Sequence, residues 1–269
     1  MTMQRGTVVA ADFTMDYFCF GSGSQTMVIL PGLSVQSVMG AAAAIAEEYA
    51  VMAEAFTVYV FDRRNELPDL YSVSDMAEDT ATAIRRLGLK NICLFGASQG
   101  GMIAMTVAAR YPSLVSKLAL CSTAASVREE AQPVIGQWIA LAEKGDREGL
   151  YLSFGKAVYP PAVFASYRAA LVAAAAGVTE EELKRFVILA TGTVGFDATR
   201  ELSAIACPVL IAGDQTDAVL GVEATHAIAS LLRDRPCTLL LYDGYGHAVY
   251  DTAPDFRQRL YDFFTEKIQ

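Results

Sequence analysis

Short apolar segments alternate with helical patterns along most of this chain, and the alternation restricts its fold more than any other feature. An uninterrupted apolar segment of this length is typical of a strand that is covered on both faces of a sheet. The segments of this kind are 27–30, 58–61, 92–95, 117–121, 208–212 and 238–242. Helical spacing or composition fills most of the intervals between them. The alternation predicts an α/β protein with a mostly parallel, doubly wound sheet. Residues 13–20 add a further strand, which we expect to end in a hairpin turn at 21–24.

The alternation stops after Ala125 and resumes at about residue 201. Helical spacing continues between these points, but no buried strand is recognisable there. We expect four helices in this interval, around 138–141, 150–154, 163–171 and 183–189. An insertion of about 75 residues suits a helical cap more than a loop. We therefore expect residues 1–125 and 201–269 to form the core, and residues 126–200 to form a four-helix cap, or lid.

Composition excludes several classes of function. Of the 269 residues, 53% are hydrophobic and 19% are charged, and the formal net charge is −9. Such a surface disfavours binding to nucleic acid or to a membrane surface. The five cysteines form no C-x-x-C pair, so a disulfide framework or structural zinc is not expected. Residues 1–16 lack a signal-peptide pattern and no apolar segment is long enough to span a bilayer, so we expect a cytoplasmic protein. The oligomeric state is not indicated.

The segment Gly96-Ala97-Ser98-Gln99-Gly100 follows one expected strand and precedes a helix. In that setting G-x-S-x-G is typical of a nucleophile elbow, a tight turn that exposes the serine hydroxyl. The residues two before and two after the serine must then be small, as both glycines are. A serine hydroxyl is a weak nucleophile unless a base lies beside it.

His247 and Asp217 are the preferred partners for Ser98. His247 lies in a glycine-flanked loop after the last expected strand, whereas the alternative, His226, lies in a helical pattern. Asp217 follows the strand at 208–212, and we prefer it to Asp214, which is closer to the strand and typical of a turn residue. The order Ser, Asp, His is the one that α/β-hydrolase triads use.

An oxyanion hole requires two N–H donors aimed at one point. We expect them to be the backbone groups of Leu33, after the strand at 27–30, and of Gln99, at the start of the helix. A substrate pocket between sheet and cap would have aromatic cap residues in its wall, although packing within the cap explains each of them equally well. These residues are Trp138, Phe154, Tyr159, Phe164 and Tyr167.

On these motifs the chain resembles the α/β-hydrolase fold family with a helical cap, over nearly its whole length. Pro31-Gly32 stands where many members have His-Gly, and Asp62-Arg63-Arg64 lacks the glycine of the D-x-R-G loop of relatives. The serine at position 98 argues against the haloalkane dehalogenases, which use aspartate there. Ser122 is not acidic, so the acid is not expected from the end of the preceding strand.

The predicted activity is hydrolysis of a small, largely apolar ester or thioester through an acyl-enzyme on Ser98, as in a carboxylesterase. A carbon–carbon bond hydrolase with the same triad is one alternative. A ligand-binding, receptor-like protein with little turnover is another, because fold alone does not establish activity. No cofactor or metal is expected, because the sequence has no G-x-G-x-x-G, Walker loop or cluster of metal ligands. The expected partner is a small-molecule substrate.

Overall fold

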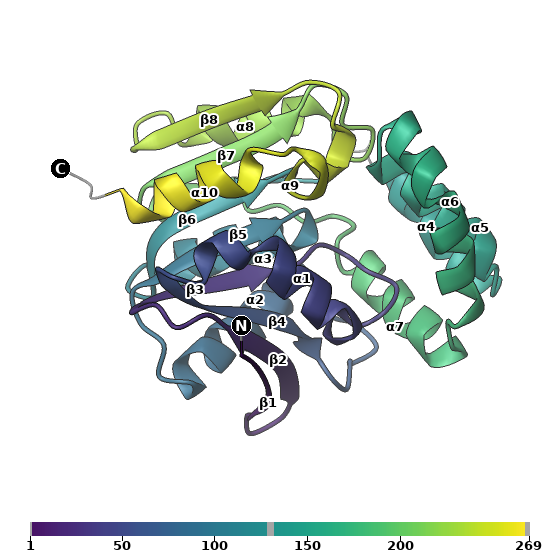
Figure 1. Cartoon of the computed structure of the whole chain (residues 1–269), viewed down its shortest axis with the longest axis horizontal. Helices are drawn as coiled ribbons and strands as arrows, with labels where there is room; N and C mark the ends of the chain where they lie inside the picture. The colour runs from purple at the N-terminus through teal and green to yellow at the C-terminus, as the bar shows by residue number, and fades with distance from the viewer. Residues whose placement is uncertain (1, 128–131, 267–269) are drawn as a thin grey trace.

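The computed structural model describes residues 2–127 and 132–266 and has an eight-stranded sheet at its centre (Figure 1). The spatial order is β1-β2-β4-β3-β5-β6-β7-β8, and all pairs from β4 to β8 are parallel. The strands are β1 (Met3–Val9), β2 (Thr14–Phe20), β3 (Gln25–Leu30), β4 (Phe56–Arg64), β5 (Ile92–Ala97), β6 (Val115–Cys121), β7 (Val209–Asp214) and β8 (Cys237–Tyr242). The mostly parallel α/β sheet that the sequence predicts is thereby confirmed.

Two details at the ends of the sheet differ from the sequence-based expectation. The turn at 21–24 is not a hairpin, because β2 pairs antiparallel with β1 and β4 while the chain continues into β3 on the far side of β4. The first strand, β1, was not expected. At the other end, Leu239 and Leu241 of the edge strand β8 are exposed, so the apolar segment 238–242 is not covered on both faces.

Helices cover both faces of the sheet. Alternate strand residues point to opposite sides: Val28 and Leu30 pack with the cluster that contains α2 and α3, whereas Met27 and Ile29 pack with the cluster that contains α1 and α10. Figure 1 shows α1 and α10 lying over the same face. The helices outside the 126–200 segment are α1 (Ala42–Glu48), α2 (Val73–Arg86), α3 (Gln99–Arg110), α8 (Val222–Leu231), α9 (Val249–Thr252) and α10 (Phe256–Thr265), with 3₁₀ turns η1 (Val38–Ala41), η2 (Ala50–Met52), η3 (Leu202–Ala204) and η4 (Gly246–Ala248).

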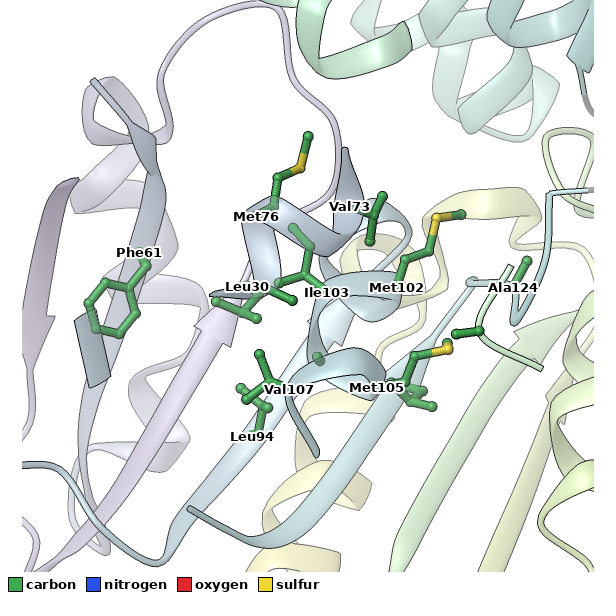
Figure 2. Close-up of a cluster of buried hydrophobic side chains, with 14 of the residues drawn as sticks. Leu30, Phe61, Val73, Met76, Leu94, Met102, Ile103, Met105, Val107 and Ala124 are labelled. Carbon is green, nitrogen blue, oxygen red and sulfur yellow. The ribbon is translucent and has the colours of Figure 1, made fainter. Parts of the chain in front are cut away.

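Helix α3 is the best-buried helix of the core. Every residue from Gln99 to Ala109 is buried, which explains why its sequence is apolar on all sides. Figure 2 shows Ile103 and Val107 of α3 close to Leu30 and Leu94 of the sheet. The start of α3 is therefore fixed against the ends of β3 and β5.

Four helices lie between β6 and β7: α4 (Gln132–Glu143), α5 (Arg147–Val158), α6 (Pro161–Ala176) and α7 (Glu180–Thr191). In Figure 1, α4, α5 and α6 stand together beside the sheet, and α7 lies nearer to the core. The segment leaves and re-enters the core at one place, because Ser126 pairs with Asp197 in an antiparallel bridge. In the described residues no single helix has the length and apolarity to cross a membrane, although the bent pair Pro161–Ala176 and Glu180–Thr191 passes that test together.

Candidate active site

Ser98 lies in the sharp turn between β5 and α3. Its backbone is left-handed, with φ 52° and ψ −122°, a strained conformation for a residue with a side chain. The flanking glycines leave room for this turn: a Cβ on Gly100 would lie 1.9 Å from the Leu30 carbonyl oxygen, and one on Gly96 would lie 2.3 Å from that of Gly100. The spacing of G-x-S-x-G is thus a steric requirement of this turn.

The structure brings Ser98, His247 and Asp217 into one hydrogen-bonded line. His247 Nε2 is 2.9 Å from Ser98 Oγ, and His247 Nδ1 is 2.9 Å from Asp217 Oδ2. The imidazole is 2% exposed and lies in η4, in the loop that follows β8. Asp217 follows β7 and is also buried. His226, the alternative histidine, is exposed on α8.

Asp217 is held as an acceptor on both oxygens. Its Oδ1 accepts hydrogen bonds from the backbone N–H groups of Val219, at 2.8 Å, and Leu220, at 3.1 Å. Burial alone would raise the pKa of this carboxyl, but the nearby His247 and the N–H donors outweigh it, so the pKa lies below its ordinary value. The carboxylate is therefore ionised at neutral pH.

Asp214 has a structural position instead. Its Oδ1 accepts from the backbone N–H and hydroxyl of Thr216, at 2.7 and 2.6 Å, and its Oδ2 accepts from the Tyr245 N–H at 2.9 Å. It therefore shapes the loop that carries Asp217 and ties it to the loop that carries His247. The turn role expected for this residue is the one it has.

The loop after β3 lies against Ser98. A Cβ on Gly32 would be 3.1 Å from Ser98 Cβ, and both Leu33 and Gln99 line the same cleft as the Ser98 hydroxyl. Among the residues that the structure describes, neither the Leu33 nor the Gln99 backbone N–H donates to a protein acceptor. Both residues thus border the cleft, and their backbone N–H groups have no acceptor within the described part of the chain.

The cleft at Ser98 is narrow, with a cavity volume of about 30 Å³, and is mostly apolar. Trp138 and Phe154 line it, with ring centroids 4.5 Å apart. Tyr159 lines a neighbouring, wider cleft of about 360 Å³, where its hydroxyl donates to Asp251 at 3.0 Å. The two clefts share Gly32, Leu33 and Tyr250.

Two of the expected pocket aromatics do not line either cleft. Phe164 packs inside the helical segment, with its ring 3.3 Å from where a Gly155 Cβ would be, and Tyr167 is exposed against Tyr159. Sequence reasoning missed the other side chains in the wall of the first cleft, since their apolar spacing is the same as that of core residues. They are Met102, Ile135, Val158, Thr193, Val219, Leu220 and Tyr250.

Within residues 2–127 and 132–266, no group of three or more His, Cys, Asp or Glu side chains is arranged to hold a metal ion. The chemistry that these residues support is proton transfer and nucleophilic attack by the Ser98 hydroxyl.

Comparison with known proteins agrees with the fold. The sequence pattern of the α/β hydrolase fold matches residues 26–147. A protein of Agrobacterium fabrum named as a carbamate hydrolase, RutD, is 26% identical over 221 residues, covering 79% of this chain and 84% of its own. The enol-lactonase of Burkholderia xenovorans superposes with a TM-score of 0.83 at 17% identity, covering 97% of this chain and all of its own. An α/β hydrolase from a deep-sea metagenome superposes at 0.87 with 19% identity over 98% of both chains.

Proposed function

Since the chain belongs to the α/β-hydrolase fold family, we propose that it is a serine hydrolase that cleaves a small, largely apolar ester or thioester through an acyl-enzyme on Ser98. The observation that carries the proposal is the 2.9 Å contact between Ser98 Oγ and His247 Nε2. It is a nucleophile–base distance at which a proton can be transferred.

In the first step, Ser98 Oγ attacks the substrate carbonyl carbon while His247 Nε2 accepts the hydroxyl proton. The carbonyl oxygen becomes negatively charged, and the N–H groups of Leu33 and Gln99 stabilise it. The positive end of α3 adds a favourable field at the same place. Asp217 holds the imidazole in the tautomer whose Nε2 is free, and its negative charge stabilises the imidazolium that forms.

In the second step, the imidazolium gives its proton to the leaving alcohol or thiol, which departs. The acyl group then remains on Ser98 Oγ. His247 next removes a proton from water, the hydroxide attacks the acyl carbon, and the tetrahedral intermediate collapses to release the acid and restore the Ser98 hydroxyl. No cofactor or metal takes part in either step.

The two clefts suggest how a substrate would lie. The apolar cleft lined by Trp138 and Phe154 suits a small acyl chain, because both rings present apolar surface to it. The wider cleft beside it contains Tyr159 and Asp251 and suits the leaving group. The helices α4–α7 would then act as a cap, since residues of α4 and α5 line the acyl cleft.

A carbamate is a second candidate, favoured by relatives that are named as carbamate hydrolases over most of this chain. Attack on a carbamate carbonyl uses the same nucleophile and oxyanion donors. Cleavage of a carbon–carbon bond and ligand binding with little turnover are alternatives that share the site. The mostly apolar wall of the cleft favours an alkyl ester over a small charged carbamate.

The test combines an activity-based probe with a substrate panel. A fluorophosphonate should label the wild type on Ser98 and should not label Ser98→Ala. Short-chain nitrophenyl esters and thioesters should be turned over faster than matched carbamates, lactones and diketones. Equal labelling of Ser98→Ala would refute the nucleophile, and preferred turnover of carbamates or diketones would replace the ester assignment.

A further inference from the structure

Arg63 contacts both segments from which the oxyanion donors come. It lies near the end of β4, is 5% exposed, and its Nη2 donates to the Pro31 carbonyl oxygen at 2.8 Å and to Gln99 Oε1 at 3.2 Å. Pro31 is two residues before Leu33, and Gln99 carries the other N–H. One guanidinium nitrogen thus connects the loop after β3 with the first residue of α3.

Gln99 is also hydrogen-bonded to the C-terminal end of α7 and the turn that follows it. Its Nε2 donates to the Leu189 carbonyl oxygen at 2.7 Å and to Thr193 Oγ1 at 2.7 Å. The Gln99 side chain is therefore bonded through both its oxygen and its nitrogen, and it is buried. A side chain fixed at both ends cannot turn without breaking buried hydrogen bonds, which is costly.

Among the residues that the structure describes, no carboxylate forms an ion pair with Arg63. The neighbouring Asp62 is bonded instead to Arg185 of α7, at 3.1 Å, and to the hydroxyl of Ser37. Among the described residues, the hydrogen-bond acceptors of the Arg63 guanidinium are neutral oxygens. Burial lowers the pKa of Arg63 to about 10, against the raising effect of Asp62, so the group remains a cation at neutral pH.

We propose that Arg63 is a positioning residue for the oxyanion hole: it fixes the Pro31–Leu33 loop and the start of α3 relative to each other, so that the N–H groups of Leu33 and Gln99 aim at one oxygen. Its side chain does not line the cleft at Ser98. It acts through the two donors, and the inference rests on the function proposed above. Preorganised donors stabilise charge that develops in the transition state, so their misplacement lowers kcat more than it raises KM.

Arg63→Met tests this, because it keeps an unbranched apolar side chain in the space of the arginine stem and removes both hydrogen bonds. Arg64→Met is the matched control: Arg64 is the next residue of β4, and it donates to Asp12 and Glu66 carbonyl oxygens and pairs with Asp79 at 3.5 Å, away from the site. We expect Arg63→Met to lower kcat on a short nitrophenyl ester by about 10-fold to 100-fold, less than the 10²–10³ for loss of a direct donor. KM should change by less than about twofold.

The inhibition constant (Ki) of an aryl trifluoromethyl ketone provides a measurement that should not change if Arg63 only stabilises the fold. This ketone forms a tetrahedral adduct with the serine, so its Ki should weaken in Arg63→Met by the same factor as kcat/KM. The product alcohol, which has no carbonyl oxygen for these donors, should inhibit as before. Arg64→Met should lower Tm and leave kcat and both Ki values near those of the wild type.

Coupling between Arg63 and Gln99 provides a second measurement. In a double-mutant cycle of Arg63→Met with Gln99→Leu, the losses in kcat should be less than multiplicative, because both changes break the same connection. If Arg63→Met does not fold, Arg63→Lys takes its place: its shorter side chain keeps the charge but reaches neither oxygen well, so kcat should fall by an intermediate factor.

The inference is overturned if folded Arg63→Met, or Arg63→Lys in its place, keeps the wild-type kcat, or if Arg64→Met loses as much kcat as Arg63→Met. In both cases a wild type that is active and labelled on Ser98 leaves the proposed function standing. A wild type that is neither labelled nor active refutes the proposed function itself.

Discussion

Asp217→Asn should abolish most turnover while the fold remains. The Val219 and Leu220 N–H groups both donate to Asp217 Oδ1, so the asparagine oxygen must take that position. The asparagine NH₂ then replaces Oδ2, 2.9 Å from His247 Nδ1, and donates to it. His247 Nδ1 also lies 3.0 Å from Oδ1, but an oxygen there already accepts from two backbone N–H groups, so the NH₂ favours the tautomer that carries its proton on Nε2. That Nε2 faces Ser98 Oγ and cannot accept the hydroxyl proton.

The expected loss in kcat is about 10⁴-fold, the size of effect produced by the wrong histidine tautomer in triads of this type. This corresponds to ~5.5 kcal/mol of lost transition-state stabilisation, at about 1.36 kcal/mol for each factor of ten. KM should change little, because Asp217 does not line the cleft at Ser98. Initial rates on a short nitrophenyl ester, with burst kinetics to count active sites, measure the effect.

Asp214→Asn is the control. All three groups bonded to Asp214 are donors or can donate, so an amide NH₂ must lose at least one of these hydrogen bonds. A buried hydrogen bond of this kind contributes about 1 to 3 kcal/mol, so Tm should fall while kcat of the folded enzyme changes less than about tenfold. A larger kcat loss in Asp214→Asn, or more than a tenth of the wild-type kcat in Asp217→Asn, would refute the assignment of the acid.

Other predictions concern the elbow, the cleft and the thiols. Gly100→Ala should prevent soluble expression, because its Cβ would lie 1.9 Å from a backbone oxygen, whereas Gly136→Ala, in open space on α4, should raise stability by about 0.5–1 kcal/mol in thermal melts. Trp138→Ala should shift the optimum of an acyl-chain series to longer chains, because the ring forms part of the wall of the acyl cleft; an unchanged optimum would place the acyl chain elsewhere. Burial raises the pKa of Cys121 to about 12 and of Cys207 to about 11, so both thiols should resist a disulfide reagent at pH 8 until the protein is denatured.

Acidification offers a test of the charge on Asp217. Its pKa is lowered in the folded protein, so the ionised carboxylate contributes stability above 3.8, the ordinary value, and that contribution is lost as the pH falls through the folded-state pKa below it. Asp217→Asn has no such group. Its Tm should therefore fall less steeply than that of the wild type below about pH 4; parallel Tm curves would contradict the direction of this pKa shift.

The sequence predicts those parts of the molecule whose signals are local. Ser98 and Asp217 each follow a buried strand, and His247 follows the apolar edge strand β8. Because parallel strands end at the same edge of a sheet, these residues, which are far apart in the chain, converge there. The order of the strands has no such local signal. The glycines at 21–24 are typical of a hairpin turn, yet β4 lies between β2 and β3 in the sheet. Which strands are neighbours depends on the pairing of the whole sheet.

The cleft shows the same limit at the level of side chains. Trp138 and Phe164 are both aromatic residues on helices, but only Trp138 lines the cleft, because Phe164 of α6 packs against Gly155 of α5. Helical spacing states which residues share a face. It does not predict which element of the fold that face packs against.

Residues 62–64 match part of the D-x-R-G motif, but the motif does not indicate which of these side chains contacts the segments that carry the oxyanion donors. The three consecutive charged residues at the end of β4 contact three different parts of the molecule. Asp62 forms an ion pair with Arg185, and Arg64 donates to the loop between β1 and β2. Arg63 donates to Pro31 and Gln99. The sequence shows three adjacent charged residues, but it does not show which partner each side chain contacts. The reactive groups can therefore be found by spacing, whereas the precision of the oxyanion donors depends on a buried arginine that becomes visible only when Pro31 and Gln99 are placed around it.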